Sequence, residues 1–174
     1  NCDYFLQLFR KYITPFAETF AYCLLKNHFH FLIRIKTPEE LEKTSQVLET
    51  CEVSPAKMSR QFSNLFNAYT KAINKAYGRE GSLFQERFRR IEVKSPRYFT
   101  HLVHYSHFNP QKHGFIDDYK EWPYSSYHSF LSEKNTNLKR KEVLQWFGGK
   151  DGFQDFHKLA NSNFVEICDV IGDD

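Results

Sequence analysis

Hydrophobic residues recur at the three- to four-residue spacing of a helix in three stretches of the chain. The first is 1–12. The second runs from Ser54 to Gly78 and opens with a side-chain cap followed by proline at the first helical position. The third opens with the same signature at Ser95, and we expect it to end at Asn109 because the residue before a proline, here Pro110, disfavours helical backbone.

A strand pattern occupies the segment AYCLLKNHFHFLIRI, residues 21–35, with a tight antiparallel turn predicted at Lys26-Asn27. Successive strand side chains point to opposite faces, so His28 and His30 share one face and the neighbouring phenylalanines share the other, which we expect to face the core. Two imidazoles at this spacing can hold one divalent cation. Surface or packed histidines would give the same pattern.

A second strand is predicted at residues 83–93, LFQERFRRIEV, although its alternation is imperfect and indicates a bulge. Arg87, Arg89 and Arg90 gather there, and Lys94 follows. Residues 57–97 carry ten basic side chains against three acidic ones, a local balance of +7 that leaves −4 for the rest of a chain with net charge +3. Such a basic segment is typical of a surface that binds polyanions, and equally of a solvated helix face.

Tyr105 and Asn109 lie four residues apart in the third helix, so both project from one flank of it. Asn109 is either a polar ligand or a cap for the helix end, and Tyr105 is either a nucleophile or a partly buried helix tyrosine. Histidines at 101, 104 and 107 surround Tyr105, and one of them could assist proton transfer.

Length and composition indicate one globular domain of 174 residues, with 41% hydrophobic, 26% charged and 17% aromatic residues. The four cysteines stand far apart with no C-x-x-C, which argues against a zinc ribbon or a disulfide framework. No apolar run is long enough to cross a bilayer, and no signal peptide opens the chain. We therefore expect a cytoplasmic protein without a membrane partner.

Four segments, in order, carry a resemblance to a known family: AYCLLKNHFHFLIRI, GSLFQERFRR, HLVHYSHFNPQKHG and WPYSSY. Together they resemble the single-tyrosine HUH transposases, and within them the REP-associated tyrosine transposase branch. The resemblance covers about residues 1–130, so the expected organisation is a transposase domain at 1–130 and a helical extension at 131–174. It implies an α+β fold, a ferredoxin-like antiparallel sheet with helices packed mainly on one face.

By this resemblance, His28, His30 and Asn109 bind a divalent metal, Mg²⁺ or Mn²⁺, and Tyr105 is the nucleophile that cleaves and rejoins single-stranded or hairpin DNA through a 5′-phosphotyrosine link. Arg87, Arg89, Arg90 and Lys94 are expected to contact the DNA backbone. A homodimer is possible through an exposed strand edge.

Two other functions fit less well. One is a domesticated DNA-binding protein that keeps the fold without turnover, and the other is a replication initiator or relaxase of the wider HUH group. Relatives usually begin with a strand before the first helix, which is absent here, so either that strand precedes Asn1 or the sheet is incomplete. Lys26 also stands in the hairpin where relatives often carry proline.

Overall fold

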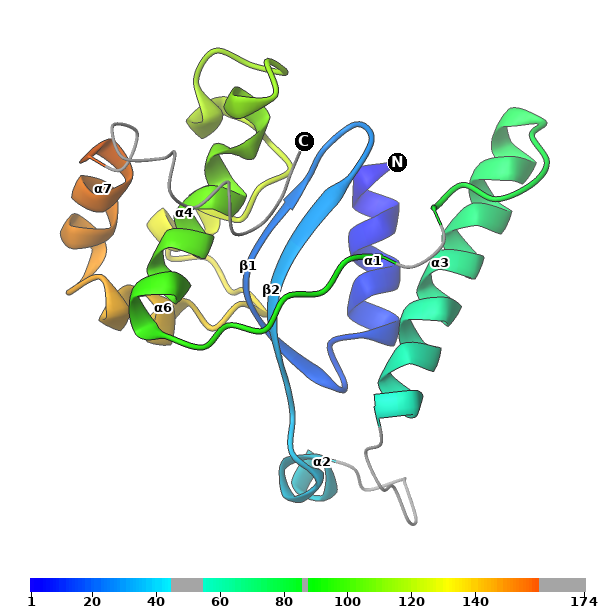
Figure 1. The fold of residues 1–174 in the computed structure, drawn as a ribbon, viewed down its shortest axis with the longest axis horizontal. Coiled ribbons are helices and arrows are strands. Elements are labelled where there is room, and N and C mark those ends of the chain that lie inside the picture. Colours follow the sequence, from blue (N-terminus) through cyan, green and yellow to red (C-terminus); the bar gives the residue numbers. More distant parts are fainter. Residues whose placement is uncertain (45–54, 86–87, 160–174) are drawn as a thin grey trace. The chain divides into compact units, whose positions relative to one another are not determined.

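The computed structural model describes residues 1–44, 55–85 and 88–159 (Figure 1). Its elements, in chain order, are α1 (Cys2–Tyr12), β1 (Ala17–Leu24), β2 (Phe29–Ile35), α2 (Pro38–Thr44), α3 (Pro55–Tyr77), α4 (Pro96–Lys112), a 3₁₀ turn η1 (Tyr119–Glu121), α5 (Tyr127–Leu131), α6 (Arg140–Trp146) and α7 (Lys150–Leu159). Helices α1 and α3 and the start of α4 therefore lie where the periodicity and the cap signals predict them.

β1 and β2 form an antiparallel hairpin (Figure 1). Among the described residues, this hairpin is the whole of the β-sheet. The N–H of Leu25 donates to the carbonyl of His28 at 2.9 Å, which places Lys26 and Asn27 at the tip of the turn. The predicted α+β class is confirmed. The predicted turn is also confirmed, and β2 begins at Phe29, immediately after His28.

The chain divides into two compact units, one made of 1–18 and 34–89 and the other of 19–33 and 90–174. In the first unit α1 packs along α3, and the two helices lie side by side in Figure 1. The hydrophobic stripe of α1 buries Phe5, Leu8 and Phe9, as its helical spacing predicts.

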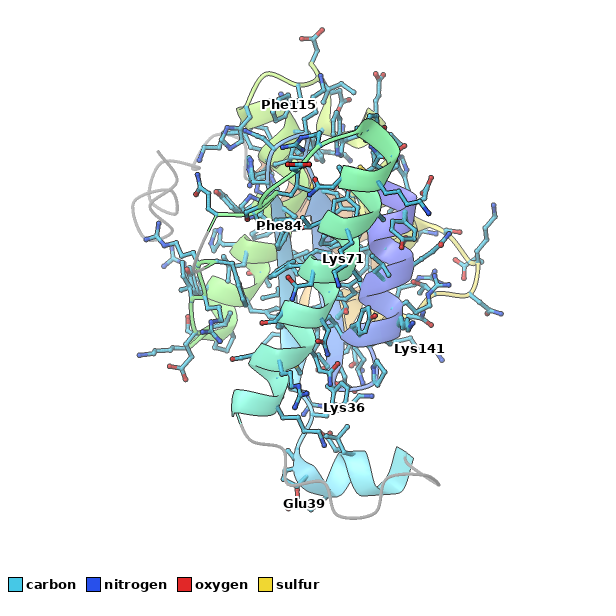
Figure 2. All side chains as sticks on the ribbon, turned by 90° about the vertical axis from the view of Figure 1, so that its right-hand side faces the viewer. Lys36, Glu39, Lys71, Phe84, Phe115 and Lys141 are labelled. Atoms are coloured by element: carbon cyan, nitrogen blue, oxygen red, sulfur yellow. The ribbon has the colours of Figure 1, made fainter. Side chains whose placement is uncertain are left out.

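The strand predicted at 83–93 is wrong, because the described part of this segment has no strand pairing. Its aromatic residues pack on α3 instead: the ring of Phe66 lies 4.7 Å from that of Phe84 and 5.4 Å from that of Phe88, between centroids. Figure 2 looks onto α3 and labels Phe84 in the segment that follows it. Aromatic rings can therefore be buried against a helix without any strand partner.

The second unit has one hydrophobic core, to which the hairpin and the helices α4 to α7 contribute. Its buried members include Phe20, Leu32, Val103, Phe130, Val143 and Phe153. Leu32 lies on the same strand face as His30, so the histidine face points into this core, whereas Phe29 and Phe31 of the opposite face are only half-buried. The expectation that the phenylalanine face alone supplies the core is therefore wrong.

The WPYSSY segment is attached to the edge of β1. Cys23 and Ser125 form an antiparallel bridge, and the indole Nε1 of Trp122 donates to the carbonyl of Leu24 at 2.9 Å. Further along, Thr19 and Leu138 form a parallel bridge. Residues beyond 130 thus share the core of this unit, and the division predicted at residue 130 stays a prediction.

The helix α4 continues through Pro110 to Lys112, so the helix end predicted at Asn109 is wrong. Gly114, two residues past the end of the helix, has a φ of +66°, a conformation that favours glycine. The N–H of Phe115 donates to the carbonyl of Pro110 at 2.9 Å and that of Gly114 to Gln111 at 3.0 Å, the bond pattern of a Schellman motif. The missing N–H of Pro110 therefore costs one hydrogen bond close to the helix end and does not stop the helix.

None of the helices in the described ranges is both long enough and apolar enough to cross a lipid bilayer.

Candidate functional site

The two histidines of the hairpin lie together at its turn end. The rings of His28 and His30 are 5.0 Å apart between centroids and perpendicular to each other. Strand geometry explains the arrangement, because residues two apart in a strand project from the same face. The hairpin therefore holds both imidazoles at a fixed separation on the side that faces the core of the second unit.

Helix α4 brings Tyr105 to the same place. The rings of Tyr105 and His30 are 5.4 Å apart between centroids, at an interplanar angle of 86°. Asn109 follows one turn later and its Nδ2 donates to the carbonyl of Tyr105 at 3.3 Å. Both are buried, Tyr105 at 1% exposure and Asn109 at 0%. The structure thus gathers the four predicted residues His28, His30, Tyr105 and Asn109 from two elements far apart in the sequence.

Burial controls the protonation of His30. Loss of solvent, reinforced by the neighbouring His28, His113 and Lys112, lowers the pKa of His30 to about 3, while Asn109 acts in the opposite direction. His30 is therefore neutral near pH 7. Its Nε2 and the Oδ1 of Asn109 are both buried, and neither makes a hydrogen bond within the described residues. Two buried polar atoms of the site are thus left without a hydrogen-bond partner among the described residues.

The tautomer of the His28 ring follows from its neighbour in the turn. Its Nδ1 lies 2.9 Å from the Oδ1 of Asn27. An amide oxygen only accepts hydrogen bonds, so the neutral imidazole carries its proton on Nδ1 and keeps the lone pair on Nε2. A histidine whose Nδ1 donates to an oxygen is held as a ligand through Nε2, the arrangement common around protein-bound metals.

Two further residues of α4 and its end belong to this cluster and were not assigned from the sequence. The Nζ of Lys112 lies 5.2 Å from the centre of the Tyr105 ring, and the ring of His113 lies 4.9 Å from that of His28. Lys112 stands seven residues after Tyr105, two helical turns along the same flank. The sequence contains this spacing, but it has structural meaning only if the helix continues past Pro110.

His107, a further histidine of α4, belongs to a separate hydrogen-bond network. His107 is fully buried on the far flank of the helix, where its Nδ1 lies 2.9 Å from Nε2 of His157 and its Nε2 lies 2.8 Å from Oγ of Ser126. The Nδ1 of His157 in turn lies 2.8 Å from the carbonyl of Phe153. A carbonyl only accepts hydrogen bonds, so His157 donates to Phe153 through Nδ1 and accepts at Nε2. His107 therefore donates to His157, and Ser126 donates to His107. With both ring nitrogens engaged, His107 is unsuited to proton transfer at Tyr105.

The predicted DNA-contacting residues lie apart from this cluster in the chain. Arg87 is outside the described residues. Arg89, Arg90 and Lys94 are exposed, and Lys94 pairs with Glu92 at 3.6 Å. That pair is 79% and 80% exposed, so it contributes little to stability and leaves Lys94 available to a ligand.

No cluster of three or more His, Cys, Asp or Glu side chains arranged to hold a metal ion is present among the described residues. The predicted ligand set differs from such a cluster because it has two imidazoles and an amide oxygen. The set offers two imidazole nitrogens and one amide oxygen, beside a phenol.

Comparisons with known proteins give homologues of one kind. A protein of Haemophilus influenzae named as a REP-associated tyrosine transposase is 30% identical over 116 residues, 66% of this chain and 60% of that protein. The REP-associated tyrosine transposase of Escherichia coli is 25% identical over 103 residues, 57% of this chain and 62% of that protein. The chain thus spans about three fifths of the length of these curated relatives. No protein-family model matches the chain.

A solved structure has a similar fold. It is that of a REP-associated tyrosine transposase bound to a REP hairpin, and it matches with a TM-score of 0.50 and 19% identity over 74% of this chain and 64% of that one. At this identity the likeness concerns the fold, and it agrees with the α+β class described above.

Proposed function

We propose that this chain, a homologue of REP-associated tyrosine transposases, cleaves and rejoins single-stranded DNA at hairpin-forming repeats through a covalent bond to Tyr105. The observation that carries the proposal is the contact between the rings of Tyr105 and His30, 5.4 Å apart, with Asn109 one turn away. A nucleophile candidate and a set of neutral ligand atoms, drawn from a helix and a hairpin, meet at one place.

The residues fit a divalent metal. Nε2 of His30, Nε2 of His28 and Oδ1 of Asn109 are the atoms that would hold Mg²⁺ or Mn²⁺. Imidazole nitrogens and an amide oxygen can ligate such a cation, and the first and third atoms are buried without a hydrogen-bond partner in the described part of the chain. When bound, such a cation would polarise a phosphate oxygen and offset its negative charge, an effect of several kcal/mol.

The proposed reaction is a displacement at phosphorus. Oη of Tyr105 attacks the phosphorus, and the bond from phosphorus to tyrosine forms as the bond to the 3′-oxygen breaks. The phenolic proton leaves to solvent, and the 3′-oxygen takes up a proton to become a hydroxyl. A free tyrosine hydroxyl has a pKa of about 10, so its activation depends on nearby positive charge. The phosphotyrosine bond keeps the energy of the diester, and a second 3′-hydroxyl can reverse the step.

A second candidate function is DNA binding without cleavage. It is favoured by the burial of Tyr105, whose side chain is only 1% exposed, because a phosphate can reach its hydroxyl only if neighbouring side chains move. Exposed basic residues such as Arg90 and Lys94 would still serve binding.

The experiment that separates the two uses single-stranded hairpin oligonucleotides labelled at either end, with Mn²⁺, on a denaturing gel. A 5′-phosphotyrosine link keeps the 3′ portion of the DNA on the protein, so only the 3′ label should migrate with it. If the protein binds the oligonucleotide but retains neither label on the denaturing gel, its function is DNA binding without cleavage.

A further inference from the structure

Lys112 is the unexplained charge of the site. Its Nζ is buried and makes no hydrogen bond within the described residues, and the ion pairs there do not include it. A lysine ammonium carries three donors, and burying it without an acceptor or a counter-charge is costly. Its Nζ lies instead over the face of the Tyr105 ring, 5.2 Å from the ring centre. The face of an aromatic ring is a weaker hydrogen-bond acceptor than an oxygen atom, so the three N–H groups of the ammonium are not fully satisfied by it.

The surroundings of Lys112 are positive or neutral. Its charge lowers the pKa of both His30 and His113, and His113 follows it directly in the chain. The other groups that act on these two histidines are imidazoles and the amide of Asn109, and no carboxylate from the described residues is among them. An ammonium that has imidazoles and an amide as neighbours, with no carboxylate among them, is suited to an anion.

We propose that Lys112 binds an oxygen of a DNA phosphate beside Tyr105. This deepens the proposed function and rests on it for the identity of the anion as the scissile phosphodiester. An ammonium donates charge-assisted hydrogen bonds to phosphate oxygens, and it offsets the negative charge that grows on them as the phenol attacks. No proton is transferred from Lys112, since its role is electrostatic and positional. His113 is the most exposed of the neighbouring side chains, so the phosphate enters beside it.

The helix end is what sets Lys112 in place. It is the last residue of α4, and the hydrogen bonds that Phe115 and Gly114 donate back to Pro110 and Gln111 fix the turn around it. A lysine on a free terminus could swing into solvent, whereas this one is held beside the Tyr105 ring. The buried ammonium is therefore preorganised for its ligand.

The first test measures binding of inorganic phosphate to the intact chain in EDTA, followed by chemical-shift changes of the Tyr105 and His30 rings. Lys112→Met removes the charge and keeps the length, Lys112→Arg keeps the charge, and Lys141→Met removes an exposed lysine of α6 in the same unit (Figure 2). We expect the phosphate affinity to fall roughly ten- to hundredfold in Lys112→Met and to change little in the other two. A wild type that binds no phosphate, or a Lys112→Met variant that binds it equally well, would overturn the proposal.

The second test follows the single-turnover rate of covalent adduct formation with a hairpin oligonucleotide and Mn²⁺. Lys112→Met should slow the rate by about two to three orders of magnitude, as for loss of one donor to a developing oxyanion. An equal rate in this variant contradicts the proposal. Added single-stranded oligonucleotide should also displace inorganic phosphate in the metal-free assay, which identifies the DNA phosphodiester as the occupant. If phosphate binds through Lys112 but the oligonucleotide does not compete, the site takes free phosphate and the DNA assignment is wrong.

The two assays separate the failure of this inference from that of the proposed function. Phosphate binding that depends on Lys112, in a protein that never forms an adduct, keeps the anion site and refutes the cleavage reaction. An adduct that forms normally in Lys112→Met refutes the anion site and keeps the reaction. The control for correct folding is the free energy of unfolding of Lys112→Met. It should equal or exceed that of the wild type, because a buried unpaired charge has been removed.

Discussion

The imidazole of His30 lies edge-on to the phenol ring of Tyr105, with 5.4 Å between their centroids. The two residues are 75 positions apart in the sequence and come from a hairpin and a helix of the same compact unit. Their contact brings a buried, neutral imidazole against the ring of a buried tyrosine. This contact joins the proposed metal ligand to the proposed nucleophile.

Replacing His30 with alanine should weaken the binding of Mn²⁺ by at least about tenfold, since a ligand is lost while its partners stay in place. Adduct formation should fall with it, and DNA binding should be retained because the exposed basic residues are unchanged. Mn²⁺ binding followed by electron paramagnetic resonance measures the first effect independently of turnover.

The matched control for His30 is His128→Ala, which removes an exposed histidine from the same unit. It should leave Mn²⁺ affinity unchanged. If His30→Ala and His128→Ala bind Mn²⁺ equally well, His30 is not a ligand and the metal site lies elsewhere or does not exist.

Arg89, Arg90 and Lys94 are predicted to contact DNA phosphates. Each contact with single-stranded DNA contributes about 0.7 to the slope of log affinity against log salt concentration. Changing all three residues to alanine should therefore reduce that slope by about 2. Fluorescence anisotropy of a labelled hairpin between low and moderate salt measures it.

Lys134, Lys141 and Lys158 provide a control of equal charge, because all three are exposed and none belongs to the basic segment. Alanine at these positions should leave the slope nearly unchanged. Equal slopes for both triple variants would mean that the contribution of the basic segment is only its net charge.

The histidine network of α7 makes the second unit sensitive to acid. Burial, with His104 nearby, lowers the pKa of His157 to about 3, whereas an unfolded histidine titrates near 6.5. Below about 6.5 the unfolded chain binds a proton that the folded chain does not, so stability is present at neutral pH and is lost as the pH falls towards 3. His157 alone contributes a slope of up to about 1.4 kcal/mol per pH unit in this window.

The measurement is the unfolding free energy in urea between pH 7 and pH 4 for wild type and His157→Phe. The variant should be less stable at pH 7, because His107 loses a hydrogen-bond partner, and its stability should fall less steeply with acid. Parallel curves for the two proteins would show that His157 does not stay neutral in the folded state.

Periodicity alone predicted the elements that have one regular pattern. Helix α1, helix α3 and the hairpin turn at Lys26-Asn27 carry their own start and stop signals, and these are local. The segment after α3 was misread because Phe84 and Phe88 look like strand residues, whereas their partner is Phe66, a contact that no local pattern contains. Strand propensity reflects burial on a flat surface, and a helix offers these rings an equivalent burial.

The end of α4 shows the same limit for the site. Proline is a strong helix breaker, so the sequence favours a helix that ends at Asn109 over one that continues to Lys112. The error hid Lys112, which shares the flank of Tyr105 only if the helix continues. His28, His30, Tyr105 and Asn109 were identified because strand and helix spacing put each pair on one face. Their meeting in space depends on how the hairpin packs on α4, which one-dimensional spacing does not contain.

Whether Tyr105 is the nucleophile is decided by a denaturing gel of the protein incubated with labelled single-stranded hairpin DNA and Mn²⁺. Wild type, Tyr105→Phe and Tyr98→Phe are compared, the last being a tyrosine of the same helix. We predict a metal-dependent covalent band for wild type and Tyr98→Phe, and none for Tyr105→Phe, with DNA binding retained in all three. A band that persists in Tyr105→Phe, or its absence from wild type that binds the hairpin, would contradict the assignment of Tyr105 as the nucleophile.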